Sequence, residues 1–339
     1  MSASHPVSRS PNSVQVERRP VAISLGDPTG IGPEIVVRAL AARPDLNVRV
    51  FGDRAILAAA AARMGLPAPP LDRVQEVPVA EVSVMVPGHP DLASARAQLA
   101  YLKAAVDAAL AGEVAALCTA PISKEWIARA GFEFPGHTEY LAARVGTADF
   151  AMMLAGPRLR VVLATRHIAL RDVPQELTIA EIVRAAVLAA RALVADFGIG
   201  CARVAVAGLN PHAGESGRFG DEEDRLVVPA IRAARGVLER ERVPAVVTGP
   251  HPPDAVFRQA ALGEFDAVVA LYHDQGLIPV KLLHFDDAAN ITLGLPFPRT
   301  SPDHGTAYGL AGTGRANPSS FLAALDLAAR LAARRPLRA

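Results

Sequence analysis

Three histidines stand directly after short apolar runs of the sequence. His167 follows RVVLAT, His212 follows RVAVAGLNP, and His273 follows DAVVALY. If these runs are strands of an α/β protein, the histidines lie at carboxyl ends of strands, where such folds bind ligands. Neutral imidazole is a common ligand of zinc and similar divalent ions, and three such ligands leave coordination positions open for a substrate. The pattern favours a catalytic metal site, although each histidine would also suit a turn or a buried hydrogen bond.

Carboxylates accompany the three histidines. Asp172, Glu215 and Asp274 each stand within a few residues of one of them. A carboxylate that accepts a hydrogen bond from a ring nitrogen orients the imidazole for metal binding. We expect Asp274, the residue after His273, to take part in the chemistry.

Lysine is rare in this chain. Only Lys103, Lys124 and Lys281 occur among 35 basic residues. In a chain so rich in arginine, a lysine at a site indicates a need for its compact ammonium. Lys281, eight residues after His273, is best placed to meet an anionic substrate. Lys124, in TAPISKEW, is a weaker candidate than Lys281 for contact with an anionic substrate. Lys103 is expected to be an ordinary surface charge.

Two further segments carry groups that suit an anion. PGHTEY places His137 beside the hydroxyl of Thr138, a pair that suits a phosphate or carboxylate, although Thr138 would also suit a helix N-cap. In AANITLGLPFPRTS, Asn290 and Arg299 supply an amide and a forked guanidinium for the same anion.

The C-terminal segment HGTAYGLAGTGRANP is rich in glycine. It contains His304, Asn317 and four glycines before a predicted helix. Glycines let backbone amides approach a ligand closely, and loops of this kind can enclose an adenosine moiety. The chain has no GxGxxG, so a standard Rossmann phosphate loop is not supported. GDPTGIGPE near the start is a second glycine-rich turn that could shape a pocket or be purely structural.

Short apolar runs alternate with long alanine- and leucine-rich stretches, which predicts an α/β fold with mostly buried, mostly parallel strands. Helices are expected over residues 32–43, 54–64, 92–110, 179–197, 222–239 and 318–330. Strands are expected over 21–25, 49–52, 83–86, 115–120, 160–165, 203–209, 245–249 and 266–272.

Composition narrows the function classes. The net charge of +1 gives no overall attraction to nucleic acid or anionic lipid. The first twenty residues lack the apolar core of a signal peptide, and no apolar run approaches a membrane span, so we expect a cytoplasmic protein with a disordered tail over 1–20. Cys118 and Cys201 stand far apart in apolar runs and are expected to be buried free thiols.

The motifs together resemble those of a known family. GDPTGIGPE, GHTE, TRHIALRDVP, GLNPHAGE, YHDQG and NITLGLPFPRTSPDHGTA occur in order from Val21 to Leu327, as in the 4-hydroxythreonine-4-phosphate dehydrogenases. The C-terminal segment also resembles the cofactor loop of isopropylmalate and isocitrate dehydrogenases. The resemblance implies a two-lobed fold of that kind with the active site in the cleft between lobes. The expected lobes are 21–130 plus 275–335 on the cofactor side, and 131–274 for substrate, metal and dimer contacts.

The resemblance also implies residue roles. The metal, which would be zinc, magnesium or cobalt, is expected on His167, His212 and His273. Substrate contacts are expected from His137, Thr138, Lys281, Asn290 and Arg299. NAD, or NADP in its place, is expected on the segment that contains His304, Gly305, Ala307, Gly312 and Asn317. A homodimer with its active site at the subunit interface is implied as well.

The implied reaction is oxidation of 4-phosphooxy-L-threonine to a β-keto acid, which decarboxylates to 3-amino-2-oxopropyl phosphate in pyridoxal 5'-phosphate biosynthesis. His137, Lys281 or a metal-bound water could take the alcohol proton. The chain departs from the family's pattern at LIPVKLLHFDDAAN, with His284, Asp286 and Asp287 expected at the pocket lip, and at His251. These departures leave two related substrates as alternatives, those of a 4-phospho-D-threonate dehydrogenase of sugar-acid catabolism and of a cis-dihydrodiol carboxylate dehydrogenase. Two readings of other classes are a non-catalytic binding protein and a phosphate-acyl transferase or hydrolase built on a similar cleft.

Overall fold

The computed structural model describes residues 19–79 and 85–335. Most of the predicted tail over 1–20, and half of the strand predicted at 83–86, lie outside the described residues. Within them, no helix is long and apolar enough to cross a membrane.

In the described part of the chain, eleven strands form one sheet in the order β3-β2-β1-β4-β11-β10-β5-β6-β9-β7-β8. The strands are β1 (Val21–Ser24), β2 (Val48–Gly52), β3 (Val74–Glu76), β4 (Ala116–Thr119), β5 (Ala151–Ala155), β6 (Arg160–Leu163), β7 (Ala202–Ala207), β8 (Ala245–His251), β9 (Ala267–Ala270), β10 (Ala289–Leu293) and β11 (Arg299–Ser301).

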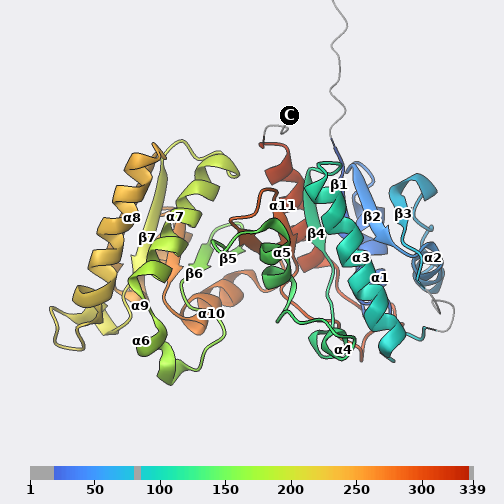
Figure 1. Ribbon diagram of the computed structural model, residues 1–339, viewed down its shortest axis with the longest axis horizontal. Helices are drawn as coiled ribbons and strands as arrows, with labels where there is room; N and C mark the ends of the chain where they lie inside the picture. Colours follow the sequence, from blue (N-terminus) through green and yellow to red (C-terminus); the bar gives the residue numbers. More distant parts are fainter. Residues whose placement is uncertain (1–18, 80–84, 336–339) are drawn as a thin grey trace, which may run out of the picture.

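The two ends of this sheet are parallel and its centre is antiparallel. β3, β2, β1, β4 and β11 pair in parallel, as do β6, β9, β7 and β8. The pairs β11–β10, β10–β5 and β5–β6 are antiparallel and join the two halves. Figure 1 shows the result, two lobes joined through β5, β6 and β10. The predicted α/β class with mostly parallel strands is confirmed.

Helices cover both faces of each lobe. The helices are α1 (Gly32–Ala42), α2 (Arg54–Arg63), α3 (Leu92–Leu110), α4 (Lys124–Arg129), α5 (His137–Val145), α6 (Val173–Glu176), α7 (Ile179–Ala195), α8 (Val228–Arg240), α9 (Pro253–Ala261), α10 (His273–His284) and α11 (Ser319–Ala332). In the first lobe, α3 packs on β1, β2 and β4, and α11 packs on β4, β10 and β11. In the second lobe, α7 and α8 pack together, while α10 contacts β6 and β9.

The six predicted helices are all present, with ends that differ by a few residues. Three of them begin with side-chain caps that the sequence encodes locally: Asp53 caps α2, and Asp91 with Ser94 and Thr178 with Glu181 form capping boxes at α3 and α7. The region predicted as one helix over 222–239 begins with a π-helical turn at Glu223–Val227 before α8. The helices α4, α5, α6 and α9 were not predicted, because a few turns carry too little periodicity to read. α10, with 12 residues, was also not predicted, and it contains Pro279, a residue that argues against a helix in a sequence.

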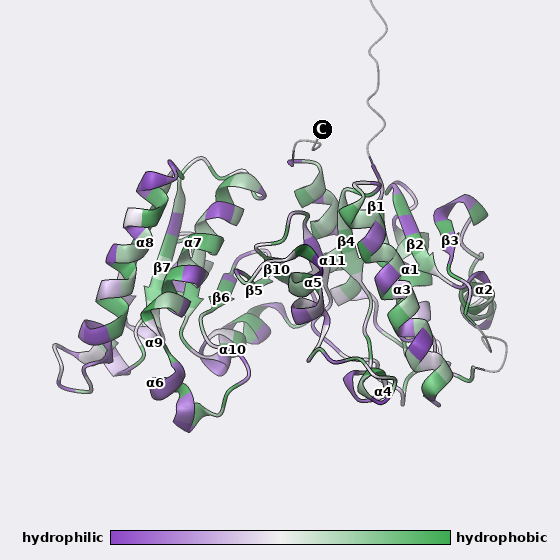
Figure 2. Cartoon of the chain, viewed as in Figure 1, coloured by the Kyte–Doolittle hydropathy of each residue, from purple (hydrophilic) through white to green (hydrophobic). Residues whose placement is uncertain are grey.

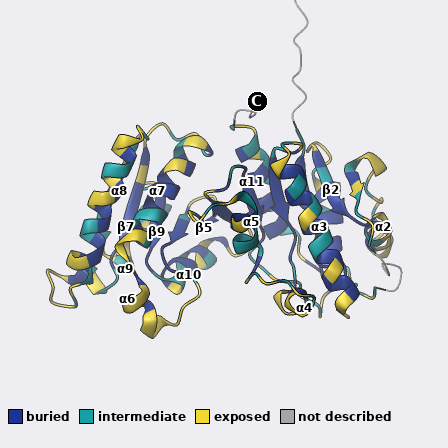
Figure 3. Ribbon diagram, in the orientation of Figure 1, coloured by how far each residue is buried: buried dark blue, intermediate teal, exposed yellow. Residues whose placement is uncertain are grey.

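The core lies along the sheet. Figure 2 shows the strands as apolar and the helices as two-sided, and Figure 3 shows that the strands are buried while the outer helix faces are exposed. Cys118 on β4 is buried and free, as expected, but Cys201 is exposed, so that half of the cysteine prediction is wrong. Cys201 stands just before β7, where the chain has not yet entered the sheet.

The discontinuous first lobe has a topological basis. β10 and β11, from late in the sequence, continue the sheet next to β4, and α11 packs over them. The boundaries predicted for the lobes, 21–130 plus 275–335 and 131–274, stay a prediction.

Candidate active site

A cavity of about 390 Å³ brings together most of the predicted substrate residues. It lies between the lobes, because α4 and α5 line one side while the segments after β6 and β9 line the other. Its lining includes Lys124, His137, Thr138, Arg166, His167, His273, Asn290, Arg299, Asp303, His304 and Gly305. The cleft between lobes that the family resemblance implied is therefore present.

Arg299, the first residue of β11, is the strongest sign that this cavity binds an anion. Its side chain is only 2% exposed. It donates to the hydroxyls of Thr292 (3.0 Å) and Thr119 (2.7 Å), and its Nε has no partner. Burial lowers the pKa of Arg299 to about 10, and no described residue forms an ion pair with it. A buried guanidinium without a carboxylate is costly, and a bound anion would offset that cost.

His137 is the first residue of α5 and faces the same cavity. Burial, with the charges of Arg299 and Lys124, holds the pKa of His137 well below its usual range, so the ring is neutral. Its Nε2 is buried and lacks a hydrogen-bond partner. The residue before α5 is Gly136, and no side chain caps the helix, so the alternative of Thr138 as an N-cap is wrong.

Unpaired buried atoms gather at this cavity. Four of the orphan polar atoms found among the described residues belong to its lining: His137 Nε2, Asn290 Oδ1, Arg299 Nε and His304 Nε2. Buried polar groups in native proteins are nearly always paired, by water or ligand where protein atoms are missing. Water or a polar ligand with both donors and acceptors would satisfy these atoms.

His167 and His273 lie side by side at the same cavity. Their ring centroids are 5.6 Å apart. Gly276 allows this approach, because a Cβ there would come within 2.6 Å of Val161 on β6 and push α10 away. His273 Nδ1 donates to Asp274 (2.7 Å), which leaves Nε2 free. Burial, Lys124 and the neighbouring His273 lower the pKa of His167, which keeps the ring neutral and able to bind metal.

His212 does not join them within one chain. It is not among the lining of the cavity, and the described residues contain no group of three His, Cys, Asp or Glu placed to hold a metal ion. It stands on the loop after β7, with 63% of its side chain exposed and Glu215 3.8 Å away.

The loop that carries His212 is strained. His212 has φ 54° and Ala213 has φ 55°, a region that residues with a Cβ rarely adopt. Glu223 compensates by accepting the backbone N–H groups of Leu209 and Asn210, both at 2.8 Å. Strain of this kind collects at functional sites, where the fold holds a side chain in a fixed place.

Lys281 is near the cavity but does not line it. Its ammonium forms an ion pair of 2.8 Å with Asp303, which does line the cavity. Lys124, which the sequence made a weaker candidate for substrate contact than Lys281, lines the cavity directly. Lys103 pairs with Asp107 on the surface of α3, as expected for an ordinary surface charge.

The predicted cofactor segment packs against the first glycine-rich turn. The Thr306 carbonyl accepts the Ile31 N–H (2.9 Å), and the Gly312 N–H donates to buried Glu34. Gly305 has open space at its Cβ position, and Ala307 has φ 45°, a conformation that residues with a Cβ rarely adopt.

Asn317, in contrast, is already engaged inside the protein. Its Oδ1 accepts the backbone N–H and the hydroxyl of Ser319 at the start of α11, and its amide donates to Asp286 (3.3 Å).

Sequence reasoning missed three residues that organise this region: Asp27, Gln98 and Asp303. Asp27 accepts a 2.8 Å bond from Gln98, which also accepts the Ser123 N–H ahead of α4. Gln98 sits on α3 and carries no local signal. The lone aspartates of GDPTG and SPDHG could have been noted, because each stands in a glycine-rich turn.

The residues that depart from the family's pattern are structural. His284 is 4% exposed, packs against Gly156, and pairs with Asp287 (2.9 Å), so its predicted place at the pocket lip is wrong. Helix α10 ends there, eleven residues beyond His273. His251 bonds Thr248 (2.9 Å) and packs on Phe265.

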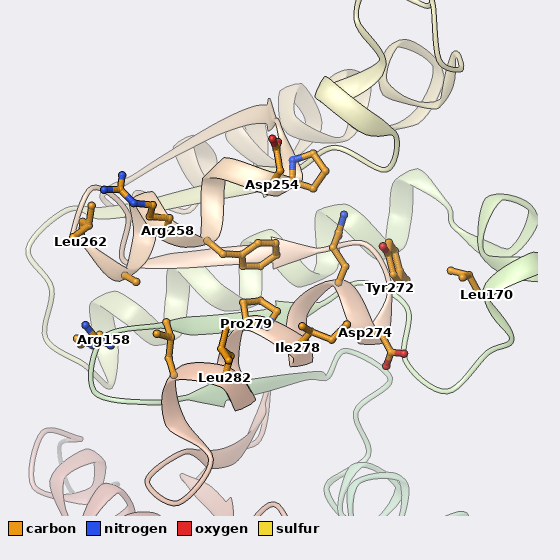
Figure 4. Close-up of a pocket in the computed structure, with 15 residues that line it drawn as sticks. Arg158, Leu170, Asp254, Arg258, Leu262, Tyr272, Asp274, Ile278, Pro279 and Leu282 are labelled. Atoms are coloured by element: carbon orange, nitrogen blue, oxygen red, sulfur yellow. The ribbon is translucent and has the colours of Figure 1, made fainter.

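An apolar groove of about 820 Å³ adjoins the histidine pair (Figure 4). α9 and α10 line it with Pro253, Phe257, Leu262, Ile278, Pro279, Leu282 and Leu283, and Tyr272 and Asp274 form the end near His273. Ile278 is 65% exposed and Leu282 is 83% exposed. Apolar side chains this exposed and this close together mark an interaction surface.

Comparison with known proteins agrees with this geometry. The family model of the pyridoxal phosphate biosynthetic protein PdxA matches residues 44–328. A 4-hydroxythreonine-4-phosphate dehydrogenase of Desulfosudis oleivorans is 50% identical over 326 residues, which cover 91% of this chain and 94% of the relative. One from Erythrobacter litoralis is 45% identical over 337 residues, which cover 94% and 98%.

Solved structures give the same result. The crystal structure of 4-hydroxythreonine-4-phosphate dehydrogenase from Klebsiella pneumoniae has a TM-score of 0.83 at 40% identity, and the match covers 93% of this chain and 99% of that one. A terephthalate 1,2-cis-dihydrodiol dehydrogenase from Burkholderia xenovorans is less similar, with a TM-score of 0.67 at 33% identity and coverage of 92% and 98%. The resemblance predicted from the sequence is confirmed, and the chain belongs to the PdxA family of pyridoxal phosphate biosynthetic proteins.

Proposed function

We propose that this chain oxidises 4-phosphooxy-L-threonine with NAD as the hydride acceptor, in the biosynthesis of pyridoxal 5'-phosphate. The observation that carries the proposal is the buried, unpaired Arg299 beside neutral His137, in one cavity with the paired His167 and His273. An anion site next to metal-type ligands suits a phosphorylated alcohol. The relatives' names, which specify this substrate, support the same reaction.

The metal fits the residues present. His167 is held neutral, and His273 keeps one ring nitrogen free because Asp274 occupies the other. Zinc, magnesium or cobalt would be held there together with His212. Such a cation supplies positive charge that favours loss of the hydroxyl proton, while the nicotinamide accepts hydride. Asp274 then positions His273 and does not itself act on the substrate, which refines the catalytic role expected for it.

Side chains of the cavity bind the substrate and accept its proton. Arg299 and Thr138 bind the phosphate, with Lys281 supplying a second positive charge. Asn290 Oδ1 accepts a hydrogen bond from the substrate amine or hydroxyl. His137 Nε2 takes the hydroxyl proton, helped by the bound phosphate, whose negative charge raises the proton affinity of the ring. The secondary alcohol loses a proton and a hydride to become 2-amino-3-oxo-4-(phosphooxy)butanoate. This β-keto acid then loses CO₂ to give 3-amino-2-oxopropyl phosphate.

The cofactor is proposed to lie along the segment from His304 to Asn317. Its backbone is already formed against the turn at Gly30 and Ile31, and His304 Nε2 is buried and unpaired. Of the residues predicted here, Gly305, Ala307 and Gly312 supply backbone, while Asn317 shapes the loop by capping α11.

A homodimer is the proposed active form, because one chain does not complete the metal site. His212 stands apart from His167 and His273, and the apolar groove along α10 runs up to Asp274. A second copy of this chain is therefore the occupant that we propose for the groove. It would cover Ile278 and Leu282 and complete the site across the interface.

Complementation between inactive variants tests the shared site. His212→Ala and His167→Ala should each abolish turnover. Co-refolding an equal mixture should restore about a quarter of wild-type activity, because half of the dimers would be mixed and each would hold one intact site. No recovery from subunits shown to have mixed would place all three ligands in one chain and overturn the shared site.

The first test of the reaction is NADH production by metal-reconstituted protein, offered 4-phosphooxy-L-threonine and 4-phospho-D-threonate in parallel assays. Faster turnover of the first supports the proposal. Preference for the second would replace the substrate assignment with sugar-acid catabolism. The same assay repeated with NADP decides the cofactor, and inactivity with both substrates and both cofactors would overturn the proposed function.

A further inference from the structure

Lys281 and Asp303 join α10 to the segment after β11 at the edge of the cavity. The ammonium lies 2.8 Å from the carboxylate, and the side chains are 42% and 26% exposed. Lys281 is on α10, which packs on β6 and β9, whereas Asp303 follows β11, which pairs with β4. The next residue after Asp303 is His304, which begins the predicted cofactor segment.

Asp303 stands between the ammonium and the ligand space. It lines the cavity together with Arg299, Ser301 and His304, and Lys281 does not. The backbone of Asp303 is anchored, because its N–H donates to the Ser320 hydroxyl on α11 (3.2 Å). A fixed carboxylate therefore holds a flexible lysine at the cavity wall.

The chemistry of an ammonium allows this arrangement to respond to a ligand. Lysine has three donors without a fixed direction, so it can bind a phosphate oxygen while it still contacts Asp303. A phosphate monoester carries roughly −1.5 to −2 charges near neutral pH, which attracts the ammonium more strongly than one carboxylate does. Without its carboxylate partner, a half-exposed lysine would lose this orientation and gain rotamer freedom.

We infer that Asp303 is a positioning residue that holds Lys281 at the cavity wall for the phosphorylated substrate, and that it ties this lysine to the start of the cofactor loop. The inference rests on the proposed function for the identity of the substrate. It does not require a particular metal, since neither residue touches the histidines expected to bind one.

The kinetic test is a double-mutant cycle. Asp303→Asn should raise KM for 4-phosphooxy-L-threonine about tenfold while kcat changes much less, because one charge-assisted contact is lost. In a Lys281→Met background, the same Asp303→Asn change should add little, since its partner is already gone. An equal rise in KM in both backgrounds would overturn the inference.

A spectroscopic test needs no turnover. With only three lysines in the chain, ¹³C reductive methylation gives few lysine signals, and Lys281→Arg identifies the one from Lys281. Asp303→Asn should shift that signal, and inorganic phosphate should shift it in the wild type. The matched control is Asp107→Asn, which breaks the surface pair with Lys103 and should move only the Lys103 signal.

The two proposals fail separately. If Lys281 responds to phosphate and to Asp303→Asn while neither phosphorylated substrate is oxidised, the proposed function is wrong and the positioning role stands. If the substrate is oxidised but the Lys281 signal ignores Asp303→Asn, the positioning role is wrong.

Discussion

The carboxylate of Asp27 accepts a 2.6 Å hydrogen bond from the hydroxyl of Tyr308, which is 281 residues later in the chain. The same oxygen accepts the Gln98 amide at 2.8 Å, and the other oxygen accepts the hydroxyl and N–H of Thr29. Burial raises the pKa of Asp27, while these donors act against the shift. The first glycine-rich turn and the predicted cofactor segment are therefore joined by a side-chain hydrogen bond.

Tyr308→Phe tests this connection. Removing the hydroxyl should cost about 1 kcal/mol of unfolding free energy and should raise KM for NAD several-fold, with little change in KM for the substrate. The matched control is Tyr101→Phe, because the Tyr101 hydroxyl is buried without a partner and its loss should be neutral or stabilising. Urea unfolding and initial rates measure both effects. If the Tyr308→Phe protein is less stable but its KM for NAD is unchanged, the Tyr308–Asp27 hydrogen bond contributes to folding only and not to cofactor binding.

Arg299→Met should separate stability from binding. Replacing an unpaired buried guanidinium with an apolar side chain of similar length should leave the free protein as stable or more stable. Substrate affinity should fall by at least tenfold, since a charge-assisted contact to phosphate is worth roughly 1.5 to 3 kcal/mol. NAD affinity should change little. Calorimetric titration of each ligand checks this, and an equal loss for both would contradict the role of Arg299.

The depressed pKa of His137 predicts acid sensitivity. In the unfolded chain this ring titrates near 6.5, whereas in the folded protein its pKa is well below that value. The unfolded state therefore binds the proton first. The stability from His137 is complete above about pH 6.5 and is lost as pH falls from there toward the folded pKa. Denaturant midpoints at pH 7.5 and 5.5 should differ more in the wild type than in His137→Gln, and parallel losses would contradict the assignment.

The exposed apolar side chains of α10 predict the assembly state. A Leu282→Asp, Ile278→Asp double variant should sediment as a folded monomer without activity, because two carboxylates would be desolvated in the interface. Leu110→Asp on α3 is the matched control, since Leu110 is 42% exposed and far from the groove in sequence and lobe. A dimeric, active double variant would show that a different face joins the subunits.

Local sequence pattern predicted many of the helices and strands and several of the residues at the cavity. The spacing of the apolar residues predicted six helices that are present in the structure, and capping boxes at Asp91 and Thr178 stabilise the starts of two of them. The order of the motifs along the chain was sufficient to identify the family. The histidines that follow predicted strands indicated the edge of the sheet where His167 and His273 lie side by side. Of the strands in the described residues, four were not predicted: β3, β5, β10 and β11. β3 and β11 have only three residues each, too few for a pattern to show, but β5 and β10 have five each and are longer than the predicted β1 and β6.

The sequence by itself determined which elements form and which groups are available for chemistry, because helix and strand periodicity and side-chain type are local properties. Tertiary structure decided which of these groups meet. In the folded chain Arg299 has no carboxylate partner among the described residues, and Lys281 forms an ion pair with Asp303. Asp27 accepts a hydrogen bond from Tyr308, and His212 lies apart from His167 and His273. These pairings follow from strand order and from how closely helices approach the sheet. Both depend on packing between segments that are separated in the chain, which no local pattern encodes.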